Sequence, residues 1–326
     1  MNIIIKLPKF IGDSIMTIPA IELLKQNYPQ ATLTLVCKAS SKDIFRDMGI
    51  EKFIIEKSHL SRVKRELNLL SEIKKESYDL GVLFHNTFLD AFIFKLASVK
   101  TIIGYNKENR KILLDFWLKI DRSRHYINHY ANLVNQYFDN KYETLPLMKI
   151  NHYPSKLLEN TPHPKVGFVL GGNNKGTRTY PKNLALNLFK EIKDSHYEIV
   201  LIGDKEDNEN NKTYYEYLKN EKANVENLSG KTTIAEFIDL IGSLDLLITI
   251  DSSAMHISAS TQTPFLVLLG KGTSAFDTVY PKVDFGTILF SGQNKIQDAD
   301  LIKAIKPKEI KHKINQLLKE GSFNEK

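Results

Sequence analysis

Short apolar runs alternate along the chain with segments in which apolar residues recur at helical spacing. Runs of a few β-branched residues suit buried parallel strands, and the intervening segments suit the helices that connect such strands. This alternation predicts an α/β protein built from βα units around parallel sheets. We expect strands at 3–7, 32–37, 53–55, 80–84 and 101–103, and again at 166–170, 198–202, 246–250 and 265–269.

Helical periodicity is clearest in the segment that begins near Leu60. Its apolar positions leave the opposite face to cations, as an amphipathic helix does. The apolar residues are Leu60, Val63, Leu67, Leu70 and Ile73, and the cations are Arg62, Lys64 and Arg65. Further helices are predicted at 125–138 and 182–193, and at the end of the chain, where Pro307 suits a helix start and Gly321 a helix end.

Periodicity fades at 140–164, a stretch that contains four prolines. Such a segment is typical of a linker. We therefore expect two domains, at 1–160 and 161–326, with the last helix as a candidate to pack back on the first domain. Ligands of two such domains are expected in a cleft, outside the carboxyl ends of the strands.

The composition is that of a globular protein. Its 326 residues, 42% of them hydrophobic and 25% charged, suffice for two cores. Apolar runs are too short to span a bilayer and the start lacks a secretory signal pattern, which favours a cytoplasmic location. The single cysteine, Cys37, excludes an intrachain disulfide and a site of several thiolates.

A net charge of +7 and a pI near 9.1 favour anionic partners. These partners are nucleic acid, an acidic membrane surface or a phosphorylated substrate, although excess lysine also suits a merely solvated surface. Because the chain shows no recognisable nucleic-acid-binding motif, a nucleic-acid-binding protein is the weaker alternative.

Two common nucleotide-binding fingerprints fail. The first strand is followed by Gly12 alone and not by a G-x-G-x-x-G turn, which disfavours a dinucleotide site. The segment SGKTT at 229–233 resembles the end of a phosphate-binding P-loop, but Val225 stands where its first glycine is required.

The segment GGNNKGTRTYPKN, which begins at Gly171, follows a predicted strand and precedes a predicted helix. Flexible glycines, free amides at a helix start and Arg178 would together suit a diphosphate. The same residues would also fit an ordinary glycine-rich loop with an exposed arginine.

Acidic residues follow three other predicted strands. Asp13 follows the first strand, Asp251 and then His256 follow 246–250, and a group of three follows 198–202, namely Asp204, Glu206 and Asp207. Such residues either cap the next helix or take protons and hydrogen bonds from a ligand's hydroxyl groups. Spacing leaves both interpretations open.

Five segments, taken in order, resemble the ADP-heptose:lipopolysaccharide heptosyltransferase family, and most closely its second heptosyltransferase. They are LPKFIGDSIMTIPAIELLK, FHNTFLDAFIFKLASVKTIIGY, GGNNKGTRTYPKN, NLSGKTTIAEFIDLIGSLDLLITIDSSAMHISAS and TPFLVLLGKGTS. The resemblance extends from Met1 to the final helix.

The resemblance implies a GT-B fold of two Rossmann-like domains, and an enzyme that transfers heptose with inversion and without a metal or other cofactor. Asp13 would be the general base and Arg178 would stabilise the ADP leaving group. Donor-binding residues would be Gly171, Gly172, Thr177, Arg178, Glu206, Asp251, Ser252, Ser253 and His256. Acceptor-binding residues would be Arg62, Lys64, Arg65 and Arg124, within a cationic half that also holds Lys107, Arg110, Lys111 and Arg122.

Implied partners are ADP-heptose or a related nucleotide sugar as donor, the inner core of lipopolysaccharide or lipooligosaccharide as acceptor, and the inner face of the cytoplasmic membrane, where the enzyme would be peripheral. Nucleic acid is not expected. Three departures from the family pattern leave the sugar open: Arg178-Thr179-Tyr180-Pro181 replaces a Lys-Arg-Trp-Pro-like stretch, Ser253 replaces a glycine, and Lys271 replaces a proline. The alternatives are transfer from another nucleotide sugar and a GT-B nucleotide-sugar epimerase.

Overall fold

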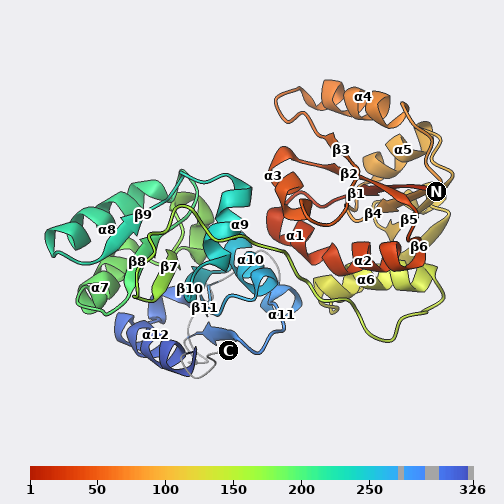
Figure 1. Cartoon of the computed structure of the whole chain (residues 1–326). Helices are drawn as coiled ribbons and strands as arrows, with labels where there is room; N and C mark the ends of the chain where they lie inside the picture. Colours follow the sequence, from red (N-terminus) through yellow and green to blue (C-terminus); the bar gives the residue numbers. More distant parts are fainter. Residues whose placement is uncertain (271–274, 291–300, 322–326) are drawn as a thin grey trace. The chain divides into compact units, whose positions relative to one another are not determined.

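The computed structural model describes residues 1–270, 275–290 and 301–321 (Figure 1). The chain divides into two compact units. The first unit comprises Met1–Ile150 with Asp277–Val279, and the second comprises Asn151–Phe276 with Tyr280–Lys326. The division after Ile150 assigns the end of the proline-bearing stretch, including residues 151–160, to the second unit.

A six-stranded parallel sheet forms the centre of the first unit. Its strands are β1 (Asn2–Lys6), β2 (Thr32–Cys37), β3 (Lys52–Ile55), β4 (Leu80–Leu83), β5 (Thr101–Asn106) and β6 (Phe116–Lys119), in the order β3-β2-β1-β4-β5-β6. Ile3, Ile4 and Ile5 of the central strand β1 are all fully buried. Consecutive apolar residues are expected where a parallel strand is covered on both faces.

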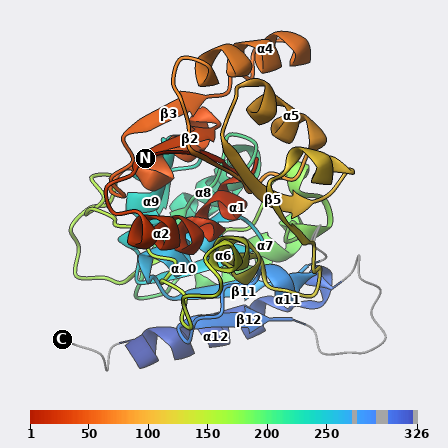
Figure 2. The ribbon, with the colours of Figure 1, turned by 90° about the vertical axis from the view of Figure 1, so that its right-hand side faces the viewer.

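Helices cover both faces of this sheet. They are α1 (Ile11–Met16), α2 (Ile18–Asn27), α3 (Ala39–Lys42), α4 (Arg62–Ile73), α5 (Phe88–Leu96) and α6 (Tyr126–Tyr137), with 3₁₀ turns η1 (Asp43–Phe45) and η2 (Arg110–Leu113). Helices α4 and α5 cover one face and α2 and α6 the other (Figures 1 and 2). Pro19 separates α1 from α2, since proline fits the first turn of a helix but not its interior.

The second unit repeats this architecture. Its strands are β7 (Lys165–Val169), β8 (Glu198–Leu201), β9 (Val225–Asn227), β10 (Leu246–Ile250), β11 (Phe265–Leu268) and β12 (Gly286–Leu289), all parallel, in the order β12-β11-β10-β7-β8-β9. The helical elements that follow β7 along the chain are η3 (Asn173–Arg178), α7 (Lys182–Ile192), α8 (Asn208–Asn220), α9 (Ile234–Gly242), α10 (Ser253–Thr261), α11 (Phe276–Val279), η5 (Ile302–Ala304) and α12 (Pro307–Gly321).

The last helix, α12, packs on α7. Its Ile310 and Ile314 lie in the same buried core as Phe168 and Phe189 of the second unit. Its apolar side therefore completes the second unit's own core, and packing on the first domain stays a prediction.

The predicted fold class is confirmed, because both sheets are parallel and alternate with helices along the chain. All nine predicted strands are present. The strands β6, β9 and β12 were not predicted, and each lies at a sheet edge. Residues 140–164 contain no helix or strand in this fully described stretch. Among the described helices, none is both long and apolar enough to cross a membrane.

Each sheet has one point at which the strand order reverses. In the first unit this point lies between β1 and β4, and in the second it lies between β7 and β10. Loops on either side of such a point diverge, so ligands of open α/β sheets bind there, outside the carboxyl ends of the strands. The topology therefore predicts ligand-binding residues in the loops after β1 and β4 and in those after β7 and β10.

Candidate functional sites

In the second unit, the loop after β7 lies very close to the loop after β8. Gly171 has a φ of +83°, which disfavours any side chain. At Gly172 a Cβ atom would lie 2.8 Å from the carbonyl oxygen of Glu206 and 2.9 Å from Oδ1 of Asp207. Two adjacent glycines are thus required for different reasons, the first for its backbone conformation and the second for space.

Side chains then fix the course of this loop. Oγ1 of Thr179 donates to the carbonyl oxygen of Gly172 at 2.7 Å, and Nζ of Lys175 lies 2.8 Å from Oδ2 of Asp204. The first contact closes the loop on itself, and the second ties it to the β8–α8 connection. Residues 173–178 form a 3₁₀ turn, interrupted at Gly176 by a φ of +58°.

Arg178 links this loop to the turn after β10. Its Nη1 donates to the carbonyl oxygen of Asp251 at 3.0 Å. Because β7 and β10 are neighbours at the reversal of strand order, the guanidinium lies at the position where the topology predicts a ligand. Arg178 and the Asp251 turn are therefore brought together, as the predicted donor site requires.

The turn after β10 is a helix start. The hydroxyl of Ser252 accepts a hydrogen bond from the backbone nitrogen of Ala254 at 3.3 Å and caps α10. Ser253 is the first residue of α10 and has an ordinary helical backbone, so the serine in place of the family's glycine is not strained here. The capping interpretation holds for Ser252 and not for Asp251.

Burial changes the pKa values of the carboxyl groups that follow β8 and β10. Burial raises the pKa of Asp251, and the nearby charge of Arg178 opposes that rise. Burial also raises the pKa of Asp207. For Asp204 burial acts in the same sense, but the hydrogen bond and charge of Lys175, together with hydrogen bonds from the Asp207 backbone and from Glu206, lower the pKa. Oδ1 of Asp207 is buried and has no hydrogen-bond partner among the described residues.

The other predicted donor-binding residues differ in how exposed they are. Glu206 is exposed but its backbone contacts Gly172, and Thr177 is exposed within η3. His256 is only 6% exposed, on the buried side of α10. Lys271, a departure from the family pattern, lies outside the described residues. Within those residues no group of three or more His, Cys, Asp or Glu side chains is arranged to hold a metal.

In the first unit, Asp13 lies in the first turn of α1, but Phe10 and not Asp13 is the N-cap residue. Of the two interpretations that the sequence left open for Asp13, helix capping therefore does not apply. Asp13 is half-buried. Its charge adds to burial in raising the pKa of Tyr130, a residue of α6, so the carboxylate lies near that phenol. The ring of Tyr130 in turn contacts Phe84, which follows β4, with centroids 5.3 Å apart.

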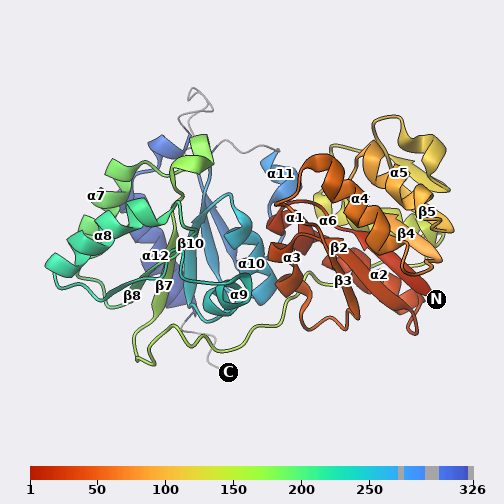
Figure 3. The ribbon, with the colours of Figure 1, turned by 90° about the horizontal axis from the view of Figure 1, so that it is seen from above.

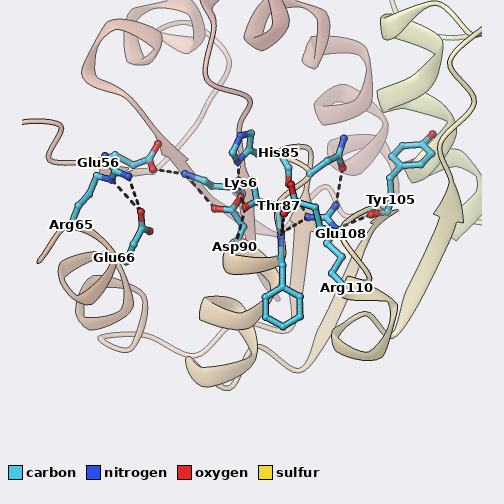
Figure 4. A network of polar contacts seen from close by, with 12 residues as sticks. Lys6, Glu56, Arg65, Glu66, His85, Thr87, Asp90, Tyr105, Glu108 and Arg110 are labelled. Atoms are coloured by element: carbon cyan, nitrogen blue, oxygen red, sulfur yellow. Dashed lines mark hydrogen bonds and ion pairs between the residues drawn. The ribbon is translucent and has the colours of Figure 1, made fainter. Parts of the chain in front are cut away.

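Beside this position, the loop after β4 is held by a buried arginine (Figure 4). Arg110 is fully buried, and its guanidinium donates four hydrogen bonds. The acceptors are the carbonyl oxygens of Tyr105 at 2.7 Å, His85 at 2.9 Å and Thr87 at 3.0 Å, and Oδ1 of Asn86 at 2.8 Å. Burial lowers the pKa of Arg110 to about 10. Arg110 is therefore a structural clamp, which corrects its inclusion among the cations available to an acceptor.

A second group of polar side chains adjoins this clamp. Nδ1 of His85 lies 2.6 Å from Oδ2 of Asp90, which also accepts from the hydroxyl of Thr87. Lys6, at the end of β1, lies 2.7 Å from Glu56 and 4.0 Å from Asp90. Although burial alone would raise the pKa of Asp90, the hydrogen bond from His85 and the charge of Lys6 lower it.

The predicted acceptor-binding cations are divided between two places. Arg62, Lys64 and Arg65 lie in the first turn of α4, after β3, and Arg65 pairs with Glu66 at 2.9 Å. Arg124 precedes α6, after β6, and lies 3.9 Å from Asp121. Strands β3 and β6 are the opposite edges of one sheet, so the structure does not gather these four cations into one cluster.

Sequence reasoning missed the clamp and its neighbours. A signal was present, since Lys6 ends the apolar run NIIIK and Asp90 interrupts the apolar segment FLDAFIFKL. Charged residues within strongly apolar elements are seldom buried unless they are paired. This rule would have indicated a buried ionic network, although not the residues that complete it.

Comparisons with known proteins show what this chain is similar to. A Campylobacter jejuni protein named lipooligosaccharide heptosyltransferase 2 is 29% identical over 273 residues, which cover 83% of this chain and 81% of that protein. The solved structure of E. coli ADP-heptose lps heptosyltransferase II matches with a TM-score of 0.84 at 20% identity, over 99% of this chain and all of that one. An E. coli heptosyltransferase solved with ADP-2-deoxy-2-fluoro heptose matches with a TM-score of 0.77 at 14% identity, over 97% and 99% of the two chains.

The two structural matches span both units, which confirms the predicted GT-B fold class. The sequence pattern of glycosyltransferase family 9, heptosyltransferase, matches residues 67–290, which is more than half of the chain. This protein is therefore an enzyme that belongs to glycosyltransferase family 9, the heptosyltransferases.

Proposed function

We propose that this enzyme transfers a heptose from ADP-heptose to the inner core of lipopolysaccharide or lipooligosaccharide, with inversion and without a metal ion. The C. jejuni relative named lipooligosaccharide heptosyltransferase 2 supports this choice of reaction within the family. The enzyme acts in the cytoplasm and associates peripherally with the inner face of the cytoplasmic membrane.

One observation carries the proposal: the hydrogen bond from Arg178 to the Asp251 carbonyl, beside the Gly171–Gly172 turn. This contact places a guanidinium beside two glycines, at the point where the strand order of the second sheet reverses. A pyrophosphate fits such an edge, because guanidinium and backbone amides both favour negative charge. Gly172 allows the β8–α8 connection to approach this edge closely, at a place where any larger residue would collide with Glu206 and Asp207.

In the proposed reaction, Asp13 accepts a proton from an acceptor hydroxyl. The resulting oxygen attacks the anomeric carbon of the donor from the face opposite ADP, a new C–O bond forms, and the bond to the diphosphate oxygen breaks. Inversion follows from attack on the opposite face, through a transition state like that of glycoside hydrolysis. Arg178 stabilises the charge that develops on the departing ADP.

The first turn of α4 suits an anionic part of the acceptor. Ser61 occupies the N-cap position, and among the described residues its side chain makes no capping hydrogen bond. The first amides of this turn therefore receive no hydrogen bond acceptor from the Ser61 side chain, and Arg62, Lys64 and Arg65 lie in the same turn. Phosphates or carboxylates of an inner-core acceptor would be held by both. Arg124, at the other edge of the sheet, would contact a different part of the acceptor.

The role of Asp13 is tested by Asp13→Asn in a purified transfer assay. General base assistance is typically worth about 10²–10⁴-fold, so turnover should fall by that factor with the fold unchanged. Asp43→Asn is the matched control, because Asp43 also lies half-buried in a first helical turn of the same unit. Near-normal turnover of Asp13→Asn would exclude Asp13 as the base.

The donor is tested with a panel of ADP-, GDP- and UDP-sugars, each with and without EDTA. We expect transfer from ADP-heptose, insensitivity to EDTA, and a large loss of ADP affinity by calorimetry in Arg178→Ala. Transfer from another nucleotide sugar, or epimerisation without an acceptor, would replace the proposed reaction by one of its alternatives. Loss of transfer in EDTA would contradict metal independence.

A further inference from the structure

Large hydrophobic side chains are exposed together on the helical layer formed by α4, α5 and η2. We call Val63, Leu67, Phe88, Phe92, Leu96 and Ile112 the apolar face. These six are more than half of the eleven large hydrophobic side chains that are exposed among the described residues. Single exposed hydrophobic residues are ordinary on a protein surface, but their concentration on neighbouring elements marks an interaction surface.

Helical spacing gives this face its continuity. Phe88, Phe92 and Leu96 recur every fourth residue on one side of α5, with exposed fractions of 39%, 41% and 44%. The rings of Phe88 and Phe92 are stacked, with centroids 6.1 Å apart. Val63 and Leu67 are spaced in the same way on α4 and are 69% and 61% exposed.

The two helices lie side by side over the same face of the sheet (Figures 1 and 3). Their inner sides, including Leu69, Ile73 and Phe94, already fill the core of the first unit. The unit therefore does not need the apolar face for its own folding.

The charges around the apolar face are predominantly positive. Its exposed cations are Arg62, Lys64, Lys95, Lys107 and Lys111. Acidic residues accompany them: Asp115 lies 3.5 Å from Lys95, Glu108 accepts a hydrogen bond from the backbone nitrogen of Phe88 at 2.9 Å, and Glu66 of α4 is paired with Arg65. A second copy of this chain would bring the same cations against one another, whereas an anionic surface complements them.

A bilayer with anionic headgroups matches both features. Phenylalanine and aliphatic side chains enter the boundary between headgroups and acyl chains, while lysine and arginine remain among the phosphates. Near an anionic surface each such cation strengthens binding by about fivefold. Lys95, Lys107 and Lys111 occur on α5 or beside η2, next to the aromatic stripe.

The start of α5 is fixed before any partner binds (Figure 4). Arg110 holds the carbonyl oxygens of His85 and Thr87, and Glu108 holds the first amide of the helix. Phe88 and Phe92 are therefore presented by a rigid element, which lowers the ordering cost of inserting them.

We propose that the apolar face of α4, α5 and η2 docks this enzyme on an anionic phospholipid bilayer. The inference deepens the proposed function, on which its biological meaning rests, because it names the surface by which the enzyme would reach an acceptor anchored in that bilayer.

The first test measures binding of the full chain to vesicles by sedimentation. Wild type should bind vesicles of phosphatidylethanolamine and phosphatidylglycerol, and bind phosphatidylcholine vesicles much more weakly. Phe88→Ser/Phe92→Ser should weaken binding at least about tenfold, since each removes an aromatic ring from the interface. Leu147→Ser/Tyr153→Ser is the matched control, because both side chains are exposed outside the apolar face. Circular dichroism and thermal unfolding verify that each variant is folded.

Charge is tested separately with Lys95→Ala/Lys111→Ala. If each cation strengthens binding about fivefold, this double variant should bind anionic vesicles roughly 25-fold more weakly than wild type. Added salt should reduce that difference. Failure of the wild-type protein to bind anionic vesicles would overturn the proposal. So would self-association that Phe88→Ser/Phe92→Ser abolishes in the absence of lipid binding, because the face would then be a protein interface.

A transfer assay separates this inference from the proposed function. With an acceptor that lacks acyl chains, Phe88→Ser/Phe92→Ser should turn over like wild type, and with the acceptor embedded in vesicles it should be slower by the factor lost in binding. Equal loss with both acceptors would overturn docking as the role of the face. If wild type transfers no heptose to the soluble acceptor, the proposed function fails while the vesicle measurement still decides the docking surface.

Discussion

The loop after β4 in the first unit and the loop after β7 in the second each lie beside the reversal of strand order in their own sheet, yet they are held in different ways. The first is held by a buried guanidinium that hydrogen-bonds three carbonyl oxygens and one amide oxygen. The second combines a close main-chain approach that only glycine permits with exposed or half-buried side-chain contacts. The first loop therefore depends mainly on a buried charge and the second mainly on the absence of a side chain, so different substitutions should damage them.

The largest expected effect is that of Arg110→Met. Removing the guanidinium leaves buried carbonyl oxygens without donors, which should lower the free energy of unfolding by about 3–5 kcal/mol. Urea denaturation followed by the fluorescence of Trp117, the chain's single tryptophan, reports on the first unit because this residue lies in β6. Arg62→Met, which removes an exposed cation of the same unit, should change stability little. A loss below about 1 kcal/mol for Arg110→Met would contradict the clamp.

Acid should destabilise the first unit next. Burial lowers the pKa of His129, which is 5% exposed, from 6.5 to about 4. The folded state thus prefers the neutral ring, and stability that is complete above pH 6.5 is lost as the pH falls toward 4, by about 3 kcal/mol. Urea titrations monitored by Trp117 at several pH values measure this loss.

His129→Phe is the control for that measurement, because phenylalanine retains an aromatic ring against Tyr105 and does not titrate. Its stability should depend less on pH between 6.5 and 4, and an unchanged slope would assign the acid sensitivity elsewhere. In the second unit Asp251 acts in the opposite sense. Its pKa is raised by burial, so protonation as the pH falls toward its ordinary value favours the folded state.

A volume change should affect the second unit selectively. In Gly172→Ala the new methyl group would meet the Glu206 carbonyl and Asp207, at a cost of about 1–3 kcal/mol. Gly176→Ala is the control for backbone strain without a steric clash: its φ of +58° and ψ of −132° strain any side chain by about 1–3 kcal/mol, but no atom lies within 4 Å. Hydrogen exchange at β7 and β8 should rise more for Gly172→Ala. Equal effects of the two variants would mean that the close approach is not restrictive.

The smallest effect is expected for the ion pair between Lys175 and Asp204. Their side chains are 25% and 41% exposed, so Lys175→Met should cost at most about 1 kcal/mol. Thermal unfolding at low and high salt tests this expectation, since screening should abolish the difference between wild type and variant. A larger, salt-insensitive loss would show that charge also supports this second loop.

The interior of each sheet was predictable from sequence, because a buried parallel strand must be apolar at successive positions. TLTLVC and LLITI illustrate this, and their predicted ranges coincide with β2 and β10. Edge strands pair on one side only and are less buried, so FWLK, VEN and GTIL lack the same signal. β9 is only three residues long. Edge strands are specified largely by the neighbouring strand to which they pair.

Strand-end loops of the candidate site were predictable for a related reason: glycine and acidic residues that follow an apolar run fall at one edge of a parallel sheet. The role of Arg110 was not, because in NKENRK it is indistinguishable from a solvated cation. Its burial depends on acceptors at 85–87, which are distant along the chain. Asp13 shows a second limit of sequence reasoning. An aspartate after a glycine suits an N-cap residue, but the N-cap residue of α1 is Phe10, three residues earlier in the chain.

The contact at Gly172 limits how relatives of this enzyme can diversify. A side chain added there collides with the neighbouring connection at Glu206 and Asp207, and a Cβ at Gly203 would itself lie 2.3 Å from Oδ2 of Asp207. A side chain therefore fits at neither glycine unless the facing residues also change. Under the proposed function, a variant that changes donor preference through a side chain at either glycine should therefore also need a compensating change in the facing connection.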